Sequence, residues 1–211
     1  MQITLFDGIL TCIFIFHVSF YNSNHMNLPT TFFGSVSWYE QIARATEPVY
    51  IEAHENFQKQ TLRTRCKIAT ANGIQTLTVP VSGSGSIKEI RISDHNNWRH
   101  LHWQALASAY GSSPFFEYYA DDIAPFFEKK WDYLFDYNLE IAHKMCELLD
   151  IRTEILLTDE YKGCTFDLRA KADCKPYYQV FQSRHGFLPD LSILDLLFNM
   201  GPEAILYLMK K

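Results

Sequence analysis

Two strand-like runs meet at Asn72-Gly73, and this pairing constrains the fold more than any other feature of the chain. The residues before it read "RTRCKIAT" and those after it read "IQTLTVPV". An Asn-Gly pair between two such runs is a strong signal for an antiparallel hairpin. We predict that the first strand begins as early as His54 and runs to Ile68.

This predicted strand carries basic side chains on alternate positions. Successive side chains of a strand point to opposite faces of the sheet. Four basic residues therefore share one face: Lys59, Arg63, Arg65 and Lys67. The other face, from Leu62 to Ile68, is mostly apolar. The sequence thus places a cationic strand face in a chain whose net charge is -5.

Two interpretations of the cationic face remain open. Lysines often protect an exposed sheet edge, which suits Lys59 and Lys67. The planar guanidinium of an arginine suits a phosphate or a carboxylate, so Arg63 and Arg65 can hold an anionic substrate or form a salt bridge within the protein. We predict substrate binding by Arg63 and Arg65, with Lys59 assisting.

The rest of the chain divides into two kinds of pattern. Residues 26–54 read as strand, helix and strand, with the helix starting just after Gly34. A helix N-terminus attracts anions, so Gly34 joins the predicted binding residues. After Asn97 the pattern is mainly helical. We predict an α/β fold that leans toward α+β: a small mixed sheet from the N-terminal half, covered by helices from the C-terminal half.

Composition narrows the class of protein. The chain has 211 residues, of which 47% are hydrophobic and 20% charged, as in ordinary globular proteins. Its acidic balance argues against general nucleic-acid binding. The five cysteines are an odd number without a Cys-x-x-Cys motif, which favours a reducing compartment, the cytoplasm.

The first 25 residues contain the apolar run "ILTCIFIFHVSFY". It is too short for a stable membrane span, which needs about 20 apolar residues. A secretory signal usually has basic residues before such a run and small residues after it, and this segment has neither. We expect residues 1–25 to be an extension upstream of the true start at Met26, and residues 26–211 to form a single domain.

The helical half offers further candidate residues. His102 is the best candidate for a general acid or base. The alternative is a purely structural role, as a buried histidine that is hydrogen-bonded within the core. Asp195 is a second catalytic candidate, and it also fits a capping motif that begins at Ser192. Asn138 lies on an apolar helix stripe and Asn199 shares a face with Asp195, so both are candidate substrate-binding residues. No motif indicates a metal site or a phosphate loop, and the sequence identifies no cofactor.

Five blocks of the sequence resemble the WbqC-like family of bacterial proteins, in a version similar to that of Bacteroides-type bacteria. The resemblance runs from about Met26 to Tyr207. The blocks are "LPTTFFGSVSWYEQIA", "YIEAHENFQKQTLRTRCKIATANGIQTLTVPV", "WRHLHWQALASAYGSSPFFEYYADDIAPFFEKK", "LFDYNLEIAHKMCELLDI" and "YYQVFQSRHGFLPDLSILDLLFNMGPEA". Lys59, Arg65, His102, Asp195 and Asn199 match the family pattern. Ala53 and His54 replace an acidic pair that other branches carry.

The resemblance implies a role in surface-polysaccharide (O-antigen) biosynthesis. It favours a cytoplasmic enzyme, an acyl- or aminoacyl-type transferase whose partner is an anionic small molecule or a nucleotide sugar. The alternative is a non-catalytic binding or interaction module in a glycan-assembly complex. The absence of a recognisable catalytic motif favours that alternative.

Overall fold

The fold is described from a computed structural model, and the structure describes residues 26–168 and 174–210. The predicted extension, residues 1–25, lies outside the described residues. The first described elements are the strand β1 (Asn27–Leu28), the helix α2 (Val36–Arg44) and the strand β2 (Val49–Ile51). β1 and β2 pair in parallel, so the predicted strand–helix–strand opening is confirmed.

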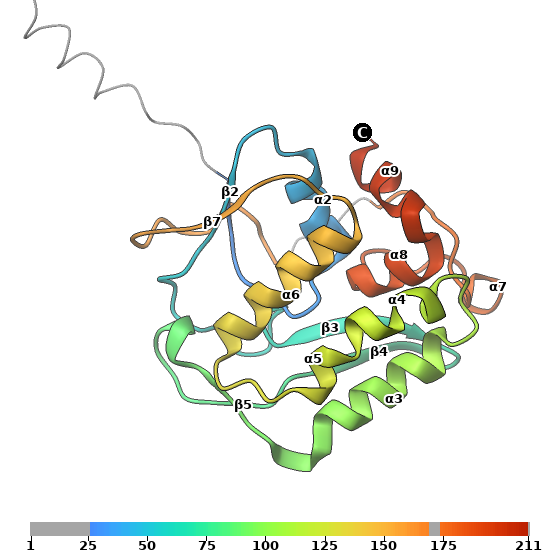
Figure 1. Cartoon of the computed structure of the whole chain (residues 1–211), viewed down its shortest axis with the longest axis horizontal. Helices are drawn as coiled ribbons and strands as arrows, with labels where there is room; N and C mark the ends of the chain where they lie inside the picture. The colour runs from blue at the N-terminus through green and yellow to red at the C-terminus, as the bar shows by residue number, and fades with distance from the viewer. Residues whose placement is uncertain (1–25, 169–173, 211) are drawn as a thin grey trace, which may run out of the picture.

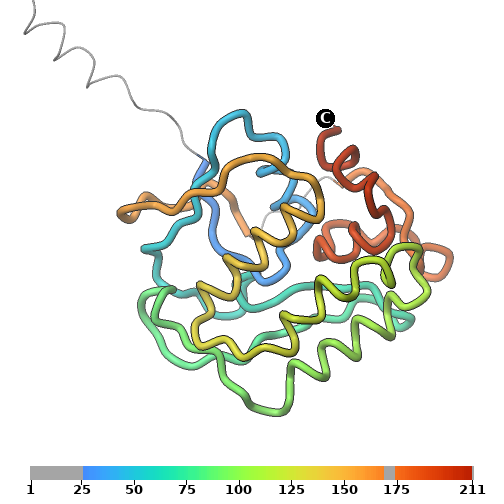
Figure 2. The backbone as a smooth tube through the Cα atoms, viewed as in Figure 1, coloured from blue at the N-terminus to red at the C-terminus, as the bar shows by residue number. Residues whose placement is uncertain are grey.

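A third strand from the second half of the chain completes this sheet. β7 (Ile155–Leu157) pairs with β2 in parallel, and the strand order is β1-β2-β7. Figure 2 shows the segment before β7 crossing beside the N-terminal strands, although more than a hundred residues separate them in sequence. All three strands therefore end at the same edge of the sheet, which we call the carboxyl edge.

The predicted hairpin is confirmed, with a shorter first strand. β3 (Arg65–Thr70) pairs antiparallel with β4 (Gly73–Thr78). Thr70 and Gly73 are partners, and Gly73 adopts a φ of 103°, which a glycine accommodates without a Cβ clash. The prediction that the strand begins at His54 was wrong, because residues 52–64 form a loop held by buried side-chain contacts. We call this segment the 52–64 loop.

Helices cover the hairpin and the parallel sheet (Figure 1). The remaining strands β5 (Val81–Ser82) and β6 (Arg91–Ile92) form a small antiparallel pair. The helices of this half are α3 (Trp98–Tyr110), α4 (Phe116–Ile123), α5 (Pro125–Glu128), α6 (Leu134–Leu148), α7 (Gln182–His185), α8 (Ile193–Met200) and α9 (Ala204–Met209), with short 3-10 turns at Ile87–Glu89, His95–Asn97 and Gly201–Glu203. The α/β class is confirmed, with the strands divided among three small sheets.

Two of the predicted elements differ from the structure. The sequence "IKEIRI" predicts one strand, but Ile87–Glu89 is a 3-10 turn and only Arg91–Ile92 pairs. The sequence "KPYYQVFQSRHG" predicts one helix from Lys175, but α7 begins only at Gln182. Tyr177 and Gln179 are buried whereas Tyr178 is exposed, so this stretch has the alternating exposure of an extended chain.

The core is rich in aromatic side chains that meet beneath the β1–α2 turn. Phe32 and Phe33 are fully buried there. The ring of Phe32 stacks on Tyr137 of α6 at 5.9 Å, and the ring of Phe33 stacks on Phe127 of α5 at 5.8 Å. These contacts join the turn after β1 to two helices, and they fix the start of α2 relative to the carboxyl edge.

Candidate functional site

The carboxyl edge is where ligands usually bind in open parallel sheets. The chain leaves β2 at Ile51 and enters the 52–64 loop there. The chain leaves β7 at Leu157 and continues through Thr158 toward Cys164. These two segments lie against each other, because the hydroxyl of Thr158 accepts a hydrogen bond from the Ala53 amide at 3.0 Å.

Glu52 is a buried carboxylate that ties the two segments together. It accepts hydrogen bonds from the His54 amide at 2.9 Å, the Thr158 hydroxyl at 3.0 Å and the Lys162 amide at 2.8 Å. Burial pushes the pKa of Glu52 upward, but these bonds and one from the Gly163 amide outweigh it and lower the pKa below its usual value. Glu52 is therefore an ionised carboxylate whose role is to position the loops.

Glu55 and Arg63 form a buried ion pair inside the 52–64 loop. Their side chains are only 6% and 4% exposed. Arg63 Nε donates to Glu55 Oε1 at 2.7 Å, Nη2 donates to Oε2, and Nη1 donates to the Thr61 hydroxyl at 3.3 Å. This two-point pairing uses the geometry for which Arg63 was predicted to bind a substrate. In the structure the anion beside Arg63 is Glu55.

The helix start after Gly34 also holds an internal carboxylate. Asp190 Oδ1 accepts a hydrogen bond from the Ser37 amide at 2.9 Å in the first turn of α2. Gly34 itself lies where a Cβ would come within 2.4 Å of the Thr31 hydroxyl oxygen. The glycine therefore permits close packing, and its predicted part in substrate binding stays a prediction.

Beside the loop lies a cavity of about 370 Å³, which we call the cationic pocket. Its lining includes Lys59, Thr61, Arg65, Lys67, Thr76 and Leu168, and among residues 26–168 and 174–210 no carboxylate side chain lines it. Arg65 and Lys67 are two apart on β3, so they share a face, whereas Cys66 and Ile68 are buried on the other. The predicted alternation is thus confirmed from Arg65 onward.

Within the described residues, the three cations of this pocket have no partner. The Nε of Arg65 is buried without a hydrogen-bond partner. None of the ion pairs formed within residues 26–168 and 174–210 involves Lys59, Arg65 or Lys67. A buried guanidinium nitrogen without a partner is uncommon in folded proteins, so the pocket is ready to accept an anion.

One polar cavity adjoins the cationic pocket, a second adjoins the first, and we call the two together the polar trough. One measures about 430 Å³ and includes Glu55, Gln58, Arg63, Tyr161 and Cys164, and it shares Thr61 and Leu168 with the cationic pocket. The other measures about 310 Å³ and is lined by His54, Glu55, Asn56, Gln58 and Tyr161. The 52–64 loop thus contributes to a cationic pocket and to a trough of hydrogen-bonding side chains.

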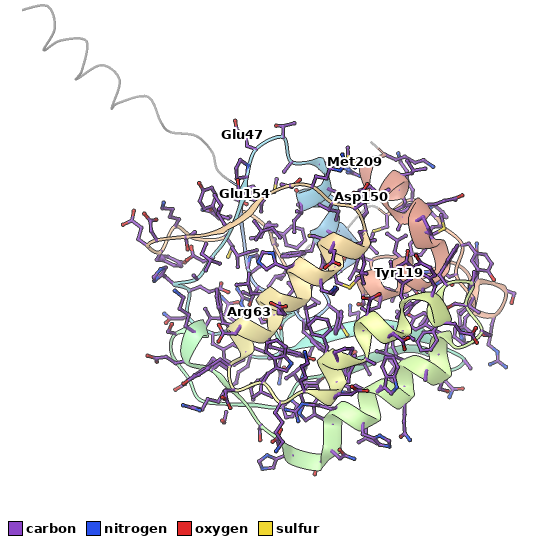
Figure 3. All side chains as sticks on the ribbon, in the orientation of Figure 1. Glu47, Arg63, Tyr119, Asp150, Glu154 and Met209 are labelled. Atoms are coloured by element: carbon purple, nitrogen blue, oxygen red, sulfur yellow. The ribbon has the colours of Figure 1, made fainter. Side chains whose placement is uncertain are left out.

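The predicted residue Asn138 lies near this loop but faces the protein interior. Its side chain is buried, and Nδ2 donates to the Arg63 carbonyl at 2.9 Å and to the Thr30 hydroxyl at 3.3 Å. Asn138 thereby attaches α6 to the 52–64 loop. Figure 3 shows Arg63 beside the ribbon of α6, in agreement with that bond. Substrate binding by Asn138 stays a prediction.

Asp195 is the centre of a second buried network, away from the pockets described above. It is fully buried and accepts hydrogen bonds from the Tyr110 hydroxyl at 2.8 Å, the Tyr177 hydroxyl at 2.6 Å and the Gln179 amide at 2.9 Å. Burial raises the pKa of Asp195, although these three bonds oppose the rise. The Tyr110 hydroxyl also accepts from the Ala69 amide, so Asp195 links α8 to α3 and β3.

Asn199 supports the same network. Its Nδ2 donates to the Asp195 carbonyl at 2.7 Å, and its Oδ1 accepts from the Val180 amide at 3.1 Å. The expected capping motif is half formed, because the Ser192 hydroxyl accepts from the Leu194 amide while the Asp195 side chain points to the tyrosines. The catalytic role of Asp195 and the binding role of Asn199 stay predictions.

His102 is a residue of α3, and its ring lies among the aromatic rings of three other residues. Its ring is 5.2 Å from Trp98, 6.1 Å from Phe32 and 6.4 Å from Phe127, measured between centroids. The Thr78 amide donates to His102 Nε2 at 3.3 Å, and burial lowers the pKa of His102 to about 4. A proton acceptor works best when its pKa lies near the working pH. The surroundings of His102 therefore favour a packing role, and its catalytic role stays a prediction.

The thiol of Cys164 also lines the polar trough. Burial, with Glu55 adding to it, raises the pKa of the Cys164 thiol to about 12, so Cys164 is not an activated nucleophile. Among the described residues, no three His, Cys, Asp or Glu side chains lie close enough to hold a metal ion. In the same part of the chain, no helix is both long enough and apolar enough to cross a bilayer.

A further cavity, of about 470 Å³, lies at the opposite edge of the parallel sheet. Its lining includes Glu47, Pro48, Asp150, Glu154 and Met209, and Pro48 and Glu154 directly precede β2 and β7. In Figure 3 the labelled residues Glu47, Asp150, Glu154 and Met209 lie well apart from Arg63. This cavity is thus separate from the carboxyl edge.

Sequence reasoning missed several residues of the site. Glu55, Tyr161 and Gln58 were not predicted, because a loop carries no periodic pattern that assigns its side chains to a face. Lys67 was noticed but attributed to edge protection. Lys67 lies two strand positions beyond Arg65 and therefore on the same face, which was the signal that could have included it.

The fold and the pockets define an α/β protein with a cationic pocket between the 52–64 loop and the β3–β4 hairpin. Residues 30–169 match the model of the WbqC-like protein family, so the chain belongs to that family. It is also 31% identical to an uncharacterized protein, Rv1507c of Mycobacterium tuberculosis, over 193 residues that cover 72% of this chain and 83% of the relative. No solved structure gave a significant match. The single domain from 26 to 211 stays a prediction.

Removing Arg63 should destabilise the protein strongly. Arg63→Met leaves the buried Glu55 with only the weak Cys164 thiol donor and without a charged partner, and breaking such a buried pair costs about 3–5 kcal/mol of unfolding free energy. The double variant Glu55→Gln/Arg63→Met should lose less than the sum of the two single variants. Urea unfolding measures these differences.

Arg152→Met is the control. The side chains of the Arg152–Asp150 pair are 86% and 71% exposed, so removing this pair should lower the unfolding free energy by less than about 1 kcal/mol. Equal losses for Arg63→Met and Arg152→Met would contradict the assignment.

The folded state should lose stability in mild acid because of His102. The pKa of His102 is about 4 when folded and 6.5 in a free side chain, so the unfolded chain binds the proton more readily between these values. We expect the contribution of His102 to fall by roughly 2–3 kcal/mol as the pH drops from 6.5 to 4. Melting temperatures across this range should depend less on pH in His102→Gln than in the wild type. The exposed neighbour His100 gives the control His100→Gln, and an identical slope in all three proteins would refute the prediction.

Proposed function

We propose that this protein binds a phosphorylated small molecule in the cationic pocket, with Lys59, Arg65 and Lys67 holding the phosphate. The observation that carries the proposal is the absence of any partner for these three cations within the described residues, together with the buried Nε of Arg65. Hydrogen bonds between charged donors and phosphate oxygens are short and strong, and they place an anion in a defined orientation.

The electrostatics of the described fold support a selective site. The net charge of the chain is -5, which repels anions in general. Two other features that attract anions, Arg63 and the start of α2, already hold Glu55 and Asp190. The cationic pocket differs from both because none of the described carboxylates lines it. An incoming phosphate would therefore be drawn to this pocket.

The ligand class that we favour is a nucleotide sugar or another sugar phosphate. The resemblance to a family linked with surface-polysaccharide gene clusters supports this choice. A cytoplasmic location belongs to the same proposal, and it is supported by three cysteines that form no disulfide among the described residues: Cys66, Cys146 and Cys164. In this role the protein is a binding module for an activated sugar during glycan assembly.

A transferase of surface-polysaccharide biosynthesis is the second candidate. The observation that favours it is the polar trough, which adjoins the cationic pocket and offers room for a second reactant. Neither His102 nor Asp195 lines the pockets at this edge, so the chemistry would fall to other side chains. Consumption of a nucleotide sugar by the purified protein, followed by phosphorus NMR, separates an enzyme from a binding module.

Phosphate affinity should depend on the three pocket cations. We expect Arg65→Ala to weaken binding of inorganic phosphate and of glucose 1-phosphate by about tenfold to a hundredfold, because a hydrogen bond to a charged group contributes about 1.5–3 kcal/mol. Lys59→Ala and Lys67→Ala should each weaken it less. Titration calorimetry measures the dissociation constants, which should rise with added salt.

Lys129→Ala provides the matched control for these variants. Lys129 is exposed and lies outside the pockets at the carboxyl edge. Its removal changes the net charge by the same amount as Arg65→Ala and should leave the affinity nearly unchanged. If Arg65→Ala binds phosphate as tightly as Lys129→Ala does, the proposed function is wrong.

A further inference from the structure

The polar trough contains an exposed aromatic ring surrounded by hydrogen-bonding side chains. Tyr161 is 67% exposed and lines both cavities of the trough. Asn56, Gln58 and His54 lie around the same cavities. An apolar ring face beside amide and imidazole groups offers stacking and hydrogen bonds in one place.

The polar groups of the trough are available to a ligand. Asn56 and Gln58 are exposed, and their side-chain amides form no hydrogen bond with the residues that the structure describes. Each amide offers two donors and an acceptor. His54 uses one ring nitrogen, Nε2, toward the Thr158 carbonyl at 3.2 Å, which leaves Nδ1 for other contacts. The set combines donors and acceptors, as a ligand rich in hydroxyl groups requires.

The backbone around the trough is held in place. Tyr161 directly precedes Lys162, whose amide donates to the buried Glu52 at 2.8 Å. The opposite wall is fixed by the Glu55–Arg63 pair. Binding costs less when the binding groups are already ordered, so the trough is suited to a small ligand.

We propose that Tyr161 and the amides of Asn56 and Gln58 form a subsite for a sugar ring, next to the phosphate position. A pyranose presents an apolar C–H face that stacks on an aromatic ring and a rim of hydroxyl groups that the amides bind. The cavities of about 310 and 430 Å³ are large enough for one such ring. Thr61 and Leu168 line both the trough and the cationic pocket, so a sugar phosphate can reach both. This subsite rests on the proposed function, because the phosphate anchors the sugar.

The test compares sugar phosphates with inorganic phosphate by titration calorimetry on the full chain. The probes are the 1-phosphates of glucose, galactose, mannose and N-acetylglucosamine, with uridine monophosphate as the base-containing probe. We expect at least one sugar 1-phosphate to bind about fivefold to tenfold more tightly than inorganic phosphate, as one aromatic stacking contact provides. In Tyr161→Ala this preference should disappear while the affinity for inorganic phosphate stays the same.

Tyr178→Ala is the matched control, because Tyr178 is also exposed, at 53%, and lies outside the trough. It should keep the sugar preference, and Gln58→Ala should reduce it. Equal binding of all sugar phosphates and inorganic phosphate, or a preference that survives Tyr161→Ala, overturns the subsite. If only uridine monophosphate binds more tightly than inorganic phosphate, and Tyr161→Ala removes that difference, then the Tyr161 ring stacks on a base. That result also overturns the sugar subsite. Loss of phosphate binding itself would instead count against the cationic pocket.

Discussion

The ion pair between Glu55 and Arg63 is the interaction on which the rest of the candidate site depends. Both side chains are almost fully buried, so each charge requires the other. The backbone carbonyl of Arg63 also receives the amide of Asn138 from α6. One arginine therefore fixes the 52–64 loop internally and against a helix. The positions of Lys59, Thr61 and Gln58 follow from that fixed loop, and with them the walls of the cationic pocket and the polar trough.

Carboxylate side chains of the protein itself occupy several of the groups that could bind an anion. Glu55 neutralises Arg63, Asp190 meets the amides at the start of α2, and Glu52 is satisfied by loop amides. Each of these carboxylates holds parts of the chain together, and each bonds to groups that would otherwise attract an anion. Arg65 and its two neighbouring lysines are left without such a partner in the described part of the chain. The candidate site is thus the group of described cations that these three carboxylates leave unpaired.

The sequence predicted the elements that depend on local pattern. The Asn72-Gly73 hairpin, the strand–helix–strand opening and the mainly helical half after Asn97 all follow from turn residues and periodicity. Residues 52–64 were wrongly assigned to a strand, because the alternation of Lys59 and Arg63 continues the pattern of β3 by coincidence. The tertiary pairing of Arg63 with Glu55 overrides that pattern. Residues 175–181 were wrongly assigned to a helix, since Tyr177 and Gln179 are drawn to Asp195, which is distant in sequence.

The central claim is that phosphate binds to Lys59, Arg65 and Lys67 while Glu55 keeps Arg63. A crystal structure of the protein with glucose 1-phosphate tests it most directly. The account predicts that the phosphate oxygens lie within hydrogen-bond distance of the Arg65 guanidinium, that the Glu55–Arg63 pair is intact, and that the sugar ring lies over Tyr161. A phosphate that displaces Glu55 from Arg63, or Asp190 from the start of α2, would contradict the account.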